Sequence, residues 1–209
     1  LAESGSEMVP IKTTGEKVQD RTLAAIGGKG LFTKEIEEAL RDGRVDLGVH
    51  SMKDMPTVLP EGLTIAALLE REDPRDALIS PVADSIANLP ARAVIGTASL
   101  RRQAQVLAKR PDLVVQPLRG NVGTRLDKLA RGEAAATLLA LAGLVRLGKA
   151  NAATAILSID EMLPAVAQGA IGIEIRAGDS RMRDLVAAVD HAPTSIAVAA
   201  ERAMLAALD

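Results

Sequence analysis

The sequence predicts an α/β protein in which two domains are joined by two crossover segments. Apolar, strand-like runs alternate with amphipathic helical patterns along the chain, which favours mostly parallel sheets covered by helices. A charged break that contains a proline interrupts this alternation at 70–76, and a second break at 164–169 precedes one more apolar run. Breaks of this kind are expected where the chain leaves a first domain and later returns to it.

The first domain is predicted to begin with a helix whose apolar face lies within 31–40 and which ends near Gly43. Short apolar or alternating runs at 45–49 and 63–69 follow as strands. The run at 170–175, after the second break, is expected to complete this sheet.

The second domain is predicted to hold strands at 77–80, 94–96, 113–115 and 136–140, with helices between them. An alanine-rich amphipathic helix follows at 194–208. Two α/β domains joined by two crossings form the architecture of type II periplasmic binding proteins. In open α/β sheets, ligands bind outside the carboxyl ends of the strands.

Composition excludes several classes of function. The chain has one Phe and no Trp or Tyr, so it lacks the aromatic platforms on which nucleic-acid bases stack. It has no cysteine, which excludes disulfides and thiolate metal sites. No apolar run approaches the roughly 18 residues that a membrane span requires. The acidic, polar segment 1–7 is unlike a signal peptide, and a cytoplasmic location is expected.

Positive charge is concentrated in one part of the chain, although the formal net charge is only −2. Segment 92–131 holds nine basic and two acidic residues, a local excess of +7. This excess predicts an anionic partner, whether a polycarboxylate, a phosphate or a nucleic acid.

Lys53 and Asp54 are the first candidates for a functional site. They follow the predicted strand at 45–49, and Pro56 prevents that strand from continuing as a central one. Their position after a strand is where a ligand would bind. The alternative is a surface ion pair, which contributes little to stability.

Arg101 and Arg102 are predicted to lie in the first turn of a helix that Thr97 or Ser99 caps. Positive side chains are unfavourable there by a few tenths of a kcal/mol each, because they face the positive end of the helix dipole. A bound anion would reverse this penalty. The alternative is a pair of solvated arginines.

Further arginines follow the next strands of the predicted second domain. Arg119 and Arg125 come after the strand at 113–115, and Arg146 comes after the strand at 136–140. Successive strand-to-helix transitions therefore direct arginines toward one rim, which favours a convergent carboxylate-binding site. The site is expected to hold a solitary acid, Asp54, among these cations.

Six segments carry a family resemblance, and they occur in the chain in a fixed order. They are GGKGLF at 27–32, VHSMKDMP at 49–56, GTASLRRQ at 96–103, LRGNVGTRL at 118–126, LAGLVRLG at 141–148 and LPAVAQGA at 163–170. Together they closely resemble the hydroxymethylbilane synthase family, also called the porphobilinogen deaminase family. The resemblance covers nearly the whole chain.

The resemblance implies a transferase of tetrapyrrole (haem) biosynthesis. The family joins four porphobilinogen molecules head to tail, releases ammonia at each addition and finally frees hydroxymethylbilane with water. Its cofactor is a dipyrromethane primer bound through a thioether to a cysteine. The implied partners are porphobilinogen and pyrrole-chain intermediates, with no nucleic acid, no membrane and a monomeric protein.

The resemblance also implies roles for individual residues. Asp54 resembles the catalytic carboxylate, which stabilises the cations that develop on the pyrrole rings. The implied cofactor contacts are Lys53, Ser51, Thr97, Ser99, Arg101, Arg102, Arg125 and Gly143. The implied contacts to substrate or the growing chain are Phe32, Arg119, Asn121, Arg146 and Gln168.

The same resemblance divides the chain into a discontinuous first domain (1–69 and 170–188), a second domain (70–169) and the first helix of a small α+β third domain (189–209). The family's N-terminal strand and its Arg-Gly-Ser-type loop are absent ahead of Leu1. The family also continues into Gly-Ser-Cys where this sequence stops. We therefore expect a fragment of a longer enzyme that is inactive on its own.

The sequence offers weaker support for several other functions. The glycine-rich run at 27–30 lacks the Ser or Thr and the first Gly of a phosphate-binding loop. His50 and His191 have no neighbouring ligand cluster, so no metal is expected and His50 is interpreted as a hydrogen-bonded neighbour of the site. A non-catalytic binding protein for a polycarboxylate would explain the arginines, but Asp54 would repel its ligand. Nucleic-acid binding is disfavoured by the lack of aromatic residues.

Overall fold

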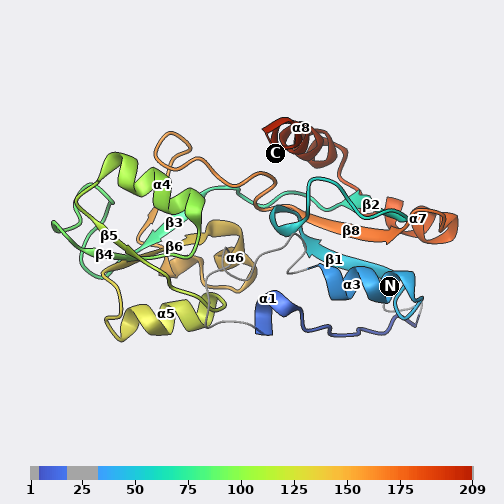
Figure 1. The fold of residues 1–209 in the computed structure, drawn as a ribbon, viewed down its shortest axis with the longest axis horizontal. Helices are drawn as coiled ribbons and strands as arrows, with labels where there is room; N and C mark the ends of the chain where they lie inside the picture. Colours follow the sequence, from blue (N-terminus) through green and yellow to red (C-terminus); the bar gives the residue numbers. More distant parts are fainter. Residues whose placement is uncertain (1–4, 18–32, 209) are drawn as a thin grey trace.

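The computed structural model of the chain describes residues 5–17 and 33–208. Within these residues the strands form two sheets, which lie side by side along the longest axis of the molecule (Figure 1). The smaller sheet has the order β1-β8-β2 and is formed by Leu47–Ser51 (β1), Ile171–Arg176 (β8) and Leu63–Leu68 (β2). The larger sheet has the order β5-β4-β6-β3-β7 and is formed by Val114–Gln116 (β5), Val94–Gly96 (β4), Ala136–Ala140 (β6), Asp76–Ile79 (β3) and Ala155–Ile156 (β7).

The smaller sheet carries helices α3 (Lys34–Arg41), α7 (Ser180–Ala187) and α8 (Ala192–Leu208). Buried side chains of α7 pack on those of β8. Helix α3 approaches the sheet so closely that a Cβ at Gly48 would lie 2.7 Å from Ile36, which explains the glycine in this strand. Helix α8 contacts β2 and lies along the outside of the sheet (Figure 1).

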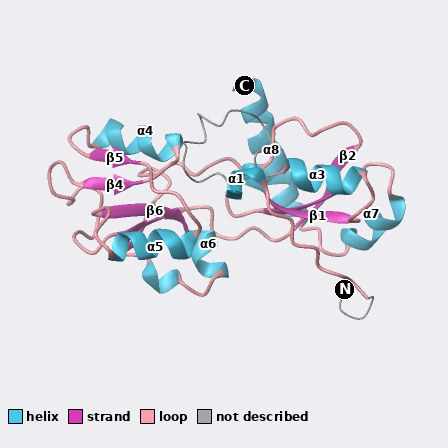
Figure 2. Cartoon of the chain, turned by 60° about the horizontal axis from the view of Figure 1, so that its bottom comes forward, coloured by secondary structure: helices cyan, strands magenta, loops and turns pink. Residues whose placement is uncertain are grey.

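Both faces of the larger sheet are covered. Helix α4 (Leu100–Lys109) packs on one face through Val106, which joins a core with Ile95 and Leu138. Helices α5 (Val122–Ala130) and α6 (Leu141–Arg146) cover the other face, where the core includes Leu139. Figure 2 shows these helices around the strands. Neighbouring residues of β6 point to opposite faces, as the two-residue period of a strand requires.

The larger sheet is mixed and the smaller sheet is antiparallel, so the expectation of mostly parallel sheets is corrected. Strand β4 pairs parallel with β5 and β6, but β3 is antiparallel to β6 and β7, and β8 is antiparallel to β1 and β2. Strands β3 and β8 each follow a crossing and enter at the edge where their neighbours end: Asp76 pairs with Ala140, and Ile171 pairs with Ser51.

Element boundaries differ from the expected ones by up to two residues. Strand β1 begins at Leu47 instead of Val45, because the backbone N–H of Val45 donates to the carbonyl of Ala39 at the end of α3. The short elements α1 (Thr14–Lys17), η2 (Met52–Asp54) and η3 (Ala150–Ala152), together with α7 and β7, were not predicted individually. Among the described residues, no helix has the length and apolar character needed to cross a membrane.

The two segments that connect the sheets lie against each other. The Nε2 of Gln168 donates to the carbonyl of Pro74 (2.7 Å), the Nε of Arg71 donates to the carbonyl of Gln168 (2.9 Å), and the N–H of Glu72 donates to the carbonyl of Gly169 (3.2 Å). Gly169 has φ +88°, and a Cβ there would lie closer than 3.0 Å to the Glu72 carbonyl oxygen. The contact between the crossings thus requires glycine at this position.

Replacing Gly169 with alanine is expected to lower the free energy of unfolding by about 1–3 kcal/mol, because the new Cβ combines a left-handed backbone with a backbone clash. The measurement is urea denaturation. Gly132→Ala is the matched control, since Gly132 has φ +74° but open space around its Cβ position. Equal losses at Gly169 and Gly132 would show that the contact between the crossings contributes nothing.

Candidate active site

The segments that carry the predicted arginines meet at one edge of the larger sheet. Strand β4 ends at Gly96 before α4, β5 ends at Gln116 before α5, and β6 ends at Ala140 and leads directly into α6. Because β4 is parallel to both β5 and β6, these carboxyl ends share an edge, as the sequence led us to expect. Strand β3 begins at the same edge with Asp76, so the first crossing also arrives there.

Lys53 and Asp54 lie in the short helix η2, directly after β1. Both residues are exposed, yet enough protein surrounds them to limit the hydration of their charged groups. Burial therefore raises the pKa of Asp54, although Lys53 and His50 oppose the rise. The structure thus provides a carboxyl group that is easier to protonate than an ordinary aspartate.

The electrostatic surroundings of Lys53 connect it to the larger sheet. Burial lowers the pKa of this lysine, Asp54 and Asp76 oppose that effect, and Arg102 and Arg101 reinforce it. The turn after β1 and the start of α4 are therefore close enough for their charges to interact. The predicted catalytic turn and the predicted arginine pair belong to one region of the molecule.

A pocket of about 230 Å³ lies beside Asp54. Its walls combine β1 and the following turn with the N-terminal segment and α3; the lining residues are Ile11, Thr13, Thr33, Ile36, Val49, His50, Ser51 and Asp54. A larger pocket of about 410 Å³ between β2 and α8 is lined mainly by apolar side chains and includes neither Lys53 nor Asp54. The chemistry therefore points to the smaller pocket.

His50 is held beside this pocket by a buried acid. Its Nε2 lies 3.0 Å from an Oε of Glu174 on the neighbouring strand β8, and both side chains are buried. The sequence-based expectation that His50 is a hydrogen-bonded neighbour of the site is confirmed.

Asp76 is a buried acid of the candidate site that sequence reasoning missed. It is fully buried, and its carboxylate accepts hydrogen bonds from Arg102 Nη2 (2.7 Å), Arg101 Nη2 (2.7 Å) and Gln168 Nε2 (2.9 Å). Burial alone would raise the pKa of Asp76, but Arg102 and Arg101 together hold it below its ordinary value. Asp76 is therefore ionised at neutral pH.

This contact corrects the argument about the arginine pair. The sequence suggested that a bound anion compensates Arg101 and Arg102 at the start of α4, whereas the structure supplies an internal anion, Asp76. The site consequently holds two acids, and Asp54 is not solitary. One signal in the sequence could have identified this acid. Asp76 ends the charged break at 70–76 and is also the first residue of an apolar strand.

The single negative charge of Asp76 does not neutralise all the cations near it. The Nη1 of Arg102 donates to the carbonyl of Leu138 (2.8 Å), while its buried Nε has no partner among the described residues. Arg125 donates through Nε to the carbonyl of Gly120 (2.8 Å). Burial lowers the pKa of Arg125, and Arg102 and Arg119 lower it further. We call Lys53, Arg101, Arg102, Arg119 and Arg125 the cation cluster.

The cation cluster is suited to an anion that carries several carboxylates. Within the described part of the chain, Asp76 is the acid that forms ion pairs with arginines of the cluster. The single negative charge of Asp76 is shared by Arg101 and Arg102. Like charges that lower one another's pKa are stabilised by a bound anion, and guanidinium groups bind carboxylates with two parallel hydrogen bonds.

Several predicted contact residues shape the loops of the site. The Oγ of Ser99 accepts a hydrogen bond from the N–H of Arg102 (3.4 Å) and caps α4, and the Oδ1 of Asn121 accepts from the N–H of Thr124 (2.9 Å) and caps α5. The buried Thr97 accepts from the N–H of Ser99 (3.2 Å). These side chains fix the helix starts that carry the arginines, and their contacts to a ligand stay predictions.

The other predicted contact residues lie outside the helix starts that carry the arginines. Gln168 is fully buried inside the crossing, and its contact to substrate stays a prediction. Arg146 is exposed and donates to the carbonyl of Gly169 (2.7 Å), and Gly143 lies within α6. Ser51 lines the pocket beside Asp54. The predicted substrate contact Phe32 lies outside the described residues.

The remaining basic residues of segment 92–131 include a group at the opposite end of the larger sheet. There Arg110 pairs with Asp112 (2.7 Å) and Arg131 pairs with Glu133 (2.7 Å), while Lys109 donates to backbone carbonyls. The excess of +7 is therefore divided between two ends of the sheet. This division disfavours a continuous basic surface of the kind that nucleic acids require.

Comparisons with known proteins show which family the chain resembles. The family described as "Porphobilinogen deaminase, dipyromethane cofactor binding domain" matches residues 1–184. The chloroplastic porphobilinogen deaminase of Oryza sativa subsp. japonica is 59% identical over 210 residues, which cover 100% of this chain and 59% of the rice protein. The porphobilinogen deaminase of Nitrobacter hamburgensis is 59% identical over 199 residues, which cover 95% of this chain and 63% of the relative.

The fold is also similar to a solved structure. A pheromone cOB1 precursor/lipoprotein of the YaeC family from Enterococcus faecalis matches with a TM-score of 0.50 and 15% identity, over 73% of this chain and 74% of the other. The fold is α/β of the periplasmic-binding-protein type, with a mixed larger sheet and an antiparallel smaller sheet. The chain spans about three fifths of the length of the rice and Nitrobacter relatives, and it belongs to the porphobilinogen deaminase family, within its dipyrromethane cofactor binding domain.

Proposed function

We propose that the longer protein containing this chain is a hydroxymethylbilane synthase, a transferase that joins four porphobilinogen molecules head to tail and releases ammonia in tetrapyrrole (haem) biosynthesis. The observation that carries the proposal is the position of the Lys53–Asp54 turn, a carboxyl group with a raised pKa, within electrostatic range of the arginines at the start of α4. Membership of the family supports the same activity.

The cation cluster fits the dipyrromethane cofactor. A dipyrromethane built from porphobilinogen carries acetate and propionate groups, and the cluster retains positive charge, including the buried Nε of Arg102 that lacks a partner among the described residues. When bound, the cofactor supplies the pyrrole carbon to which substrate units are added. The residues proposed to hold it are Lys53, Ser51, Thr97, Ser99, Arg101, Arg102, Arg125 and Gly143. The thioether requires a cysteine, which these 209 residues do not contain.

Asp54 is proposed to stabilise positive charge on the substrate. When the protonated aminomethyl group of porphobilinogen leaves as ammonia, the remaining ring becomes a cation whose charge extends to the pyrrole nitrogen. A carboxylate beside that N–H stabilises the charge where it develops. After the new carbon–carbon bond forms, the same carboxylate can accept the proton that leaves the ring carbon.

The growing product accumulates carboxylates, so its binding requires additional cations. Arg119 and Arg146, with Asn121, are proposed to contact the substrate or the elongating chain, and Phe32 is proposed to lie near the substrate. Gln168 is also proposed to contact the substrate, from its buried position in the second crossing.

We also propose the domain division 1–69 with 170–188, and 70–169, with 189–209 as the start of a third domain. The grouping of β1, β2 and β8 in one sheet and β3 to β7 in the other supports it. A monomeric state and a cytoplasmic location stay predictions from the sequence, and the rice relative is described as chloroplastic.

Mass spectrometry of the intact, full-length protein tests the proposed function. We expect a covalent adduct of two pyrrole units, and porphobilinogen should add further units of the same mass. Unmodified protein that binds polycarboxylates reversibly would reject the synthase and favour the alternative, a non-catalytic two-domain binding protein.

A further inference from the structure

The charged side chains of the Lys53–Asp54 turn are not held by other side chains. Neither side chain has a hydrogen bond or ion pair with another residue in the described part of the structure, and both are exposed. The backbone of residues 51–57 therefore sets where the Asp54 side chain leaves the chain. Contacts that fix this backbone limit the region that the carboxyl group can reach.

The first end of the turn is anchored in the smaller sheet. The N–H of Met52 donates to the carbonyl of Ala170 (3.0 Å), and the N–H of Met55 donates to the carbonyl of Met52 (3.3 Å). The side chain of Met52 is buried. After Met55 the backbone has fewer donors, because Pro56 has no N–H. The second end of the turn can be held mainly through its carbonyl groups.

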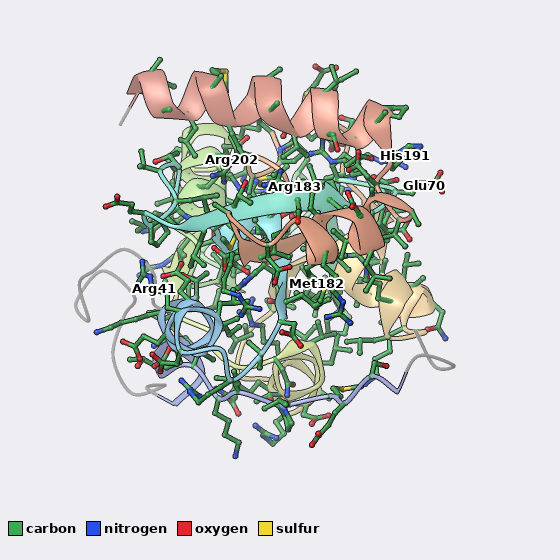
Figure 3. The ribbon with its side chains drawn as sticks, turned by 90° about the vertical axis from the view of Figure 1, so that its right-hand side faces the viewer. Arg41, Glu70, Met182, Arg183, His191 and Arg202 are labelled. Carbon is green, nitrogen blue, oxygen red and sulfur yellow. The ribbon has the colours of Figure 1, made fainter. Side chains whose placement is uncertain are left out.

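Arg202 of α8 binds those carbonyl groups. Its Nη2 donates to the carbonyls of Pro56 (2.5 Å) and Thr57 (3.1 Å), and its Nη1 lies 3.5 Å from the carbonyl of Met55. Burial lowers the pKa of Arg202, and no acidic group contributes to the shift. Arg202 lies on the side of α8 that faces the smaller sheet (Figure 3). Its guanidinium therefore serves the backbone of the turn rather than an ion pair.

Helix α8 is itself fixed to the crossings, one residue before Arg202. The carboxylate of Glu201 accepts from both Nη atoms of Arg71 in the first crossing and from the N–H of Ala167 in the second crossing (2.7 Å). Val198, one turn earlier, packs in a core cluster with Met52 and Met55. Arg202 thus extends from a helix that is fixed on two sides, so it can act as a rigid support.

We propose that Arg202 is a positioning residue, which sets the position of the Lys53–Asp54 turn by binding the carbonyls of residues 55–57 from α8. It does not touch the reacting atoms and acts through the backbone that carries Asp54. Its kinetic consequence rests on the proposed function, whereas its effect on the turn does not.

Arg202→Met tests this proposal, because methionine keeps an apolar stem but removes every donor. Hydrogen exchange of the amides within 53–59, apart from Pro56, is measured in the 209-residue chain. We expect about tenfold faster exchange there than in the parent, which corresponds to the loss of hydrogen bonds. Amides of β8 should change little. Unchanged exchange in 53–59 would overturn the proposal, whatever the full-length protein catalyses.

Arg183→Met is the matched control. Arg183 lies on α7, which packs against the same smaller sheet (Figure 3). It also donates to a backbone carbonyl, that of Ala177 (2.9 Å), which is far from the turn in the sequence. We expect it to leave exchange in 53–59 unchanged. If Arg202→Met fails to fold, Arg202→Lys keeps a donor at the site and should show an intermediate increase; normal exchange in that variant together with an altered β8 would overturn the proposal.

The titration of Asp54 is a second readout. The titratable groups that act on Asp54 are Lys53 beside it and His50 of β1, and the residues that α3 and the N-terminal segment contribute to the pocket have no ionisable side chain. A loosened turn hydrates the carboxyl group, so its pKa, followed by carbon NMR, should fall in Arg202→Met. A titration identical to that of the parent would contradict the proposal.

Kinetics of the full-length protein give the functional readout. Misplacement of a catalytic group can lower the rate by about 100-fold, so we expect kcat to fall by up to this factor in Arg202→Met, with a smaller change in KM and partial recovery in Arg202→Lys. A variant with a lowered melting temperature but normal kcat would reduce Arg202 to a structural role. A parent protein without activity would reject the proposed function and leave the exchange result as the test of Arg202.

Discussion

Asp54→Asn is expected to lower kcat by about 100- to 1,000-fold in the full-length protein, the usual effect of removing one preorganised group that stabilises a developing charge. Asparagine keeps the size of the side chain but loses the negative charge that would face the pyrrole N–H groups. Steady-state assays with porphobilinogen measure the effect. Asp184→Asn, which changes an exposed acid on α7, is the matched control and should retain normal kcat. Near-normal output from Asp54→Asn would reject the catalytic role.

The same variant is expected to fold and to be at least as stable as the parent at neutral pH. The pKa of Asp54 is raised by burial, so stability is lost as the pH rises through the folded-state pKa. Asparagine removes this cost, and the two proteins should converge in stability below the ordinary carboxyl pKa. If catalysis requires the ionised carboxylate, kcat should fall on the acid side of its pH profile, and the apparent pKa of that fall should lie above the ordinary pKa of an aspartate.

Asp76→Asn is expected to lower the free energy of unfolding by about 3–5 kcal/mol at neutral pH, because it leaves the buried guanidinium of Arg102 without its anion. The NH2 group of an asparagine at this position would also face the N–H groups of Arg101 or Gln168, which now donate to the carboxylate. The pKa of Asp76 is lowered, so its contribution is present above the ordinary carboxyl pKa and is lost as the pH falls through the folded-state value. The deficit should therefore be full at pH 7 and shrink in strong acid.

Urea denaturation of the 209-residue chain measures this deficit. Asp127→Asn, at an exposed position of α5, is the control and should change stability by less than about 0.5 kcal/mol. If Asp76→Asn lowered the free energy of unfolding no more than this control does, Asp76 would not be the counter-ion of the arginine pair.

The arrangement of the arginine rim could be predicted from the sequence, because parallel strands bring their carboxyl ends to one edge. Gly96, Gln116 and Ala140 end neighbouring strands, and the residues after them carry the cation cluster's arginines and Arg146. Local patterns were sufficient here, since each strand-to-helix transition is visible within about ten residues.

The internal acid could not be predicted in the same way. Asp76 contacts Arg101 and Arg102, 25 and 26 residues later in the chain, and it belongs to a run of charges that resembles a solvated linker. The burial of Asp76 depends on the pairing of β3 with β6, which no local pattern specifies. The direction of β3 and β8 was missed for the same reason.

The contacts of α8 also depend on tertiary structure. The amphipathic pattern predicted this helix, but nothing near Arg202 in the sequence indicates that its donors reach carbonyls about 145 residues earlier. Side chains that bind backbone carbonyls leave no complementary residue type in the sequence, and only the folded chain shows them.

A crystal structure of the full-length protein with its pyrrole cofactor tests the central claim most directly: a carboxylate next to the ring nitrogens, opposite cations that bind acidic side groups. We predict an oxygen of Asp54 within about 2.6–3.2 Å of a pyrrole nitrogen, and cofactor carboxylates on Arg101, Arg102 and Arg125. An Asp54 carboxyl directed away from the rings, or a cofactor bound without these arginines, would contradict the account.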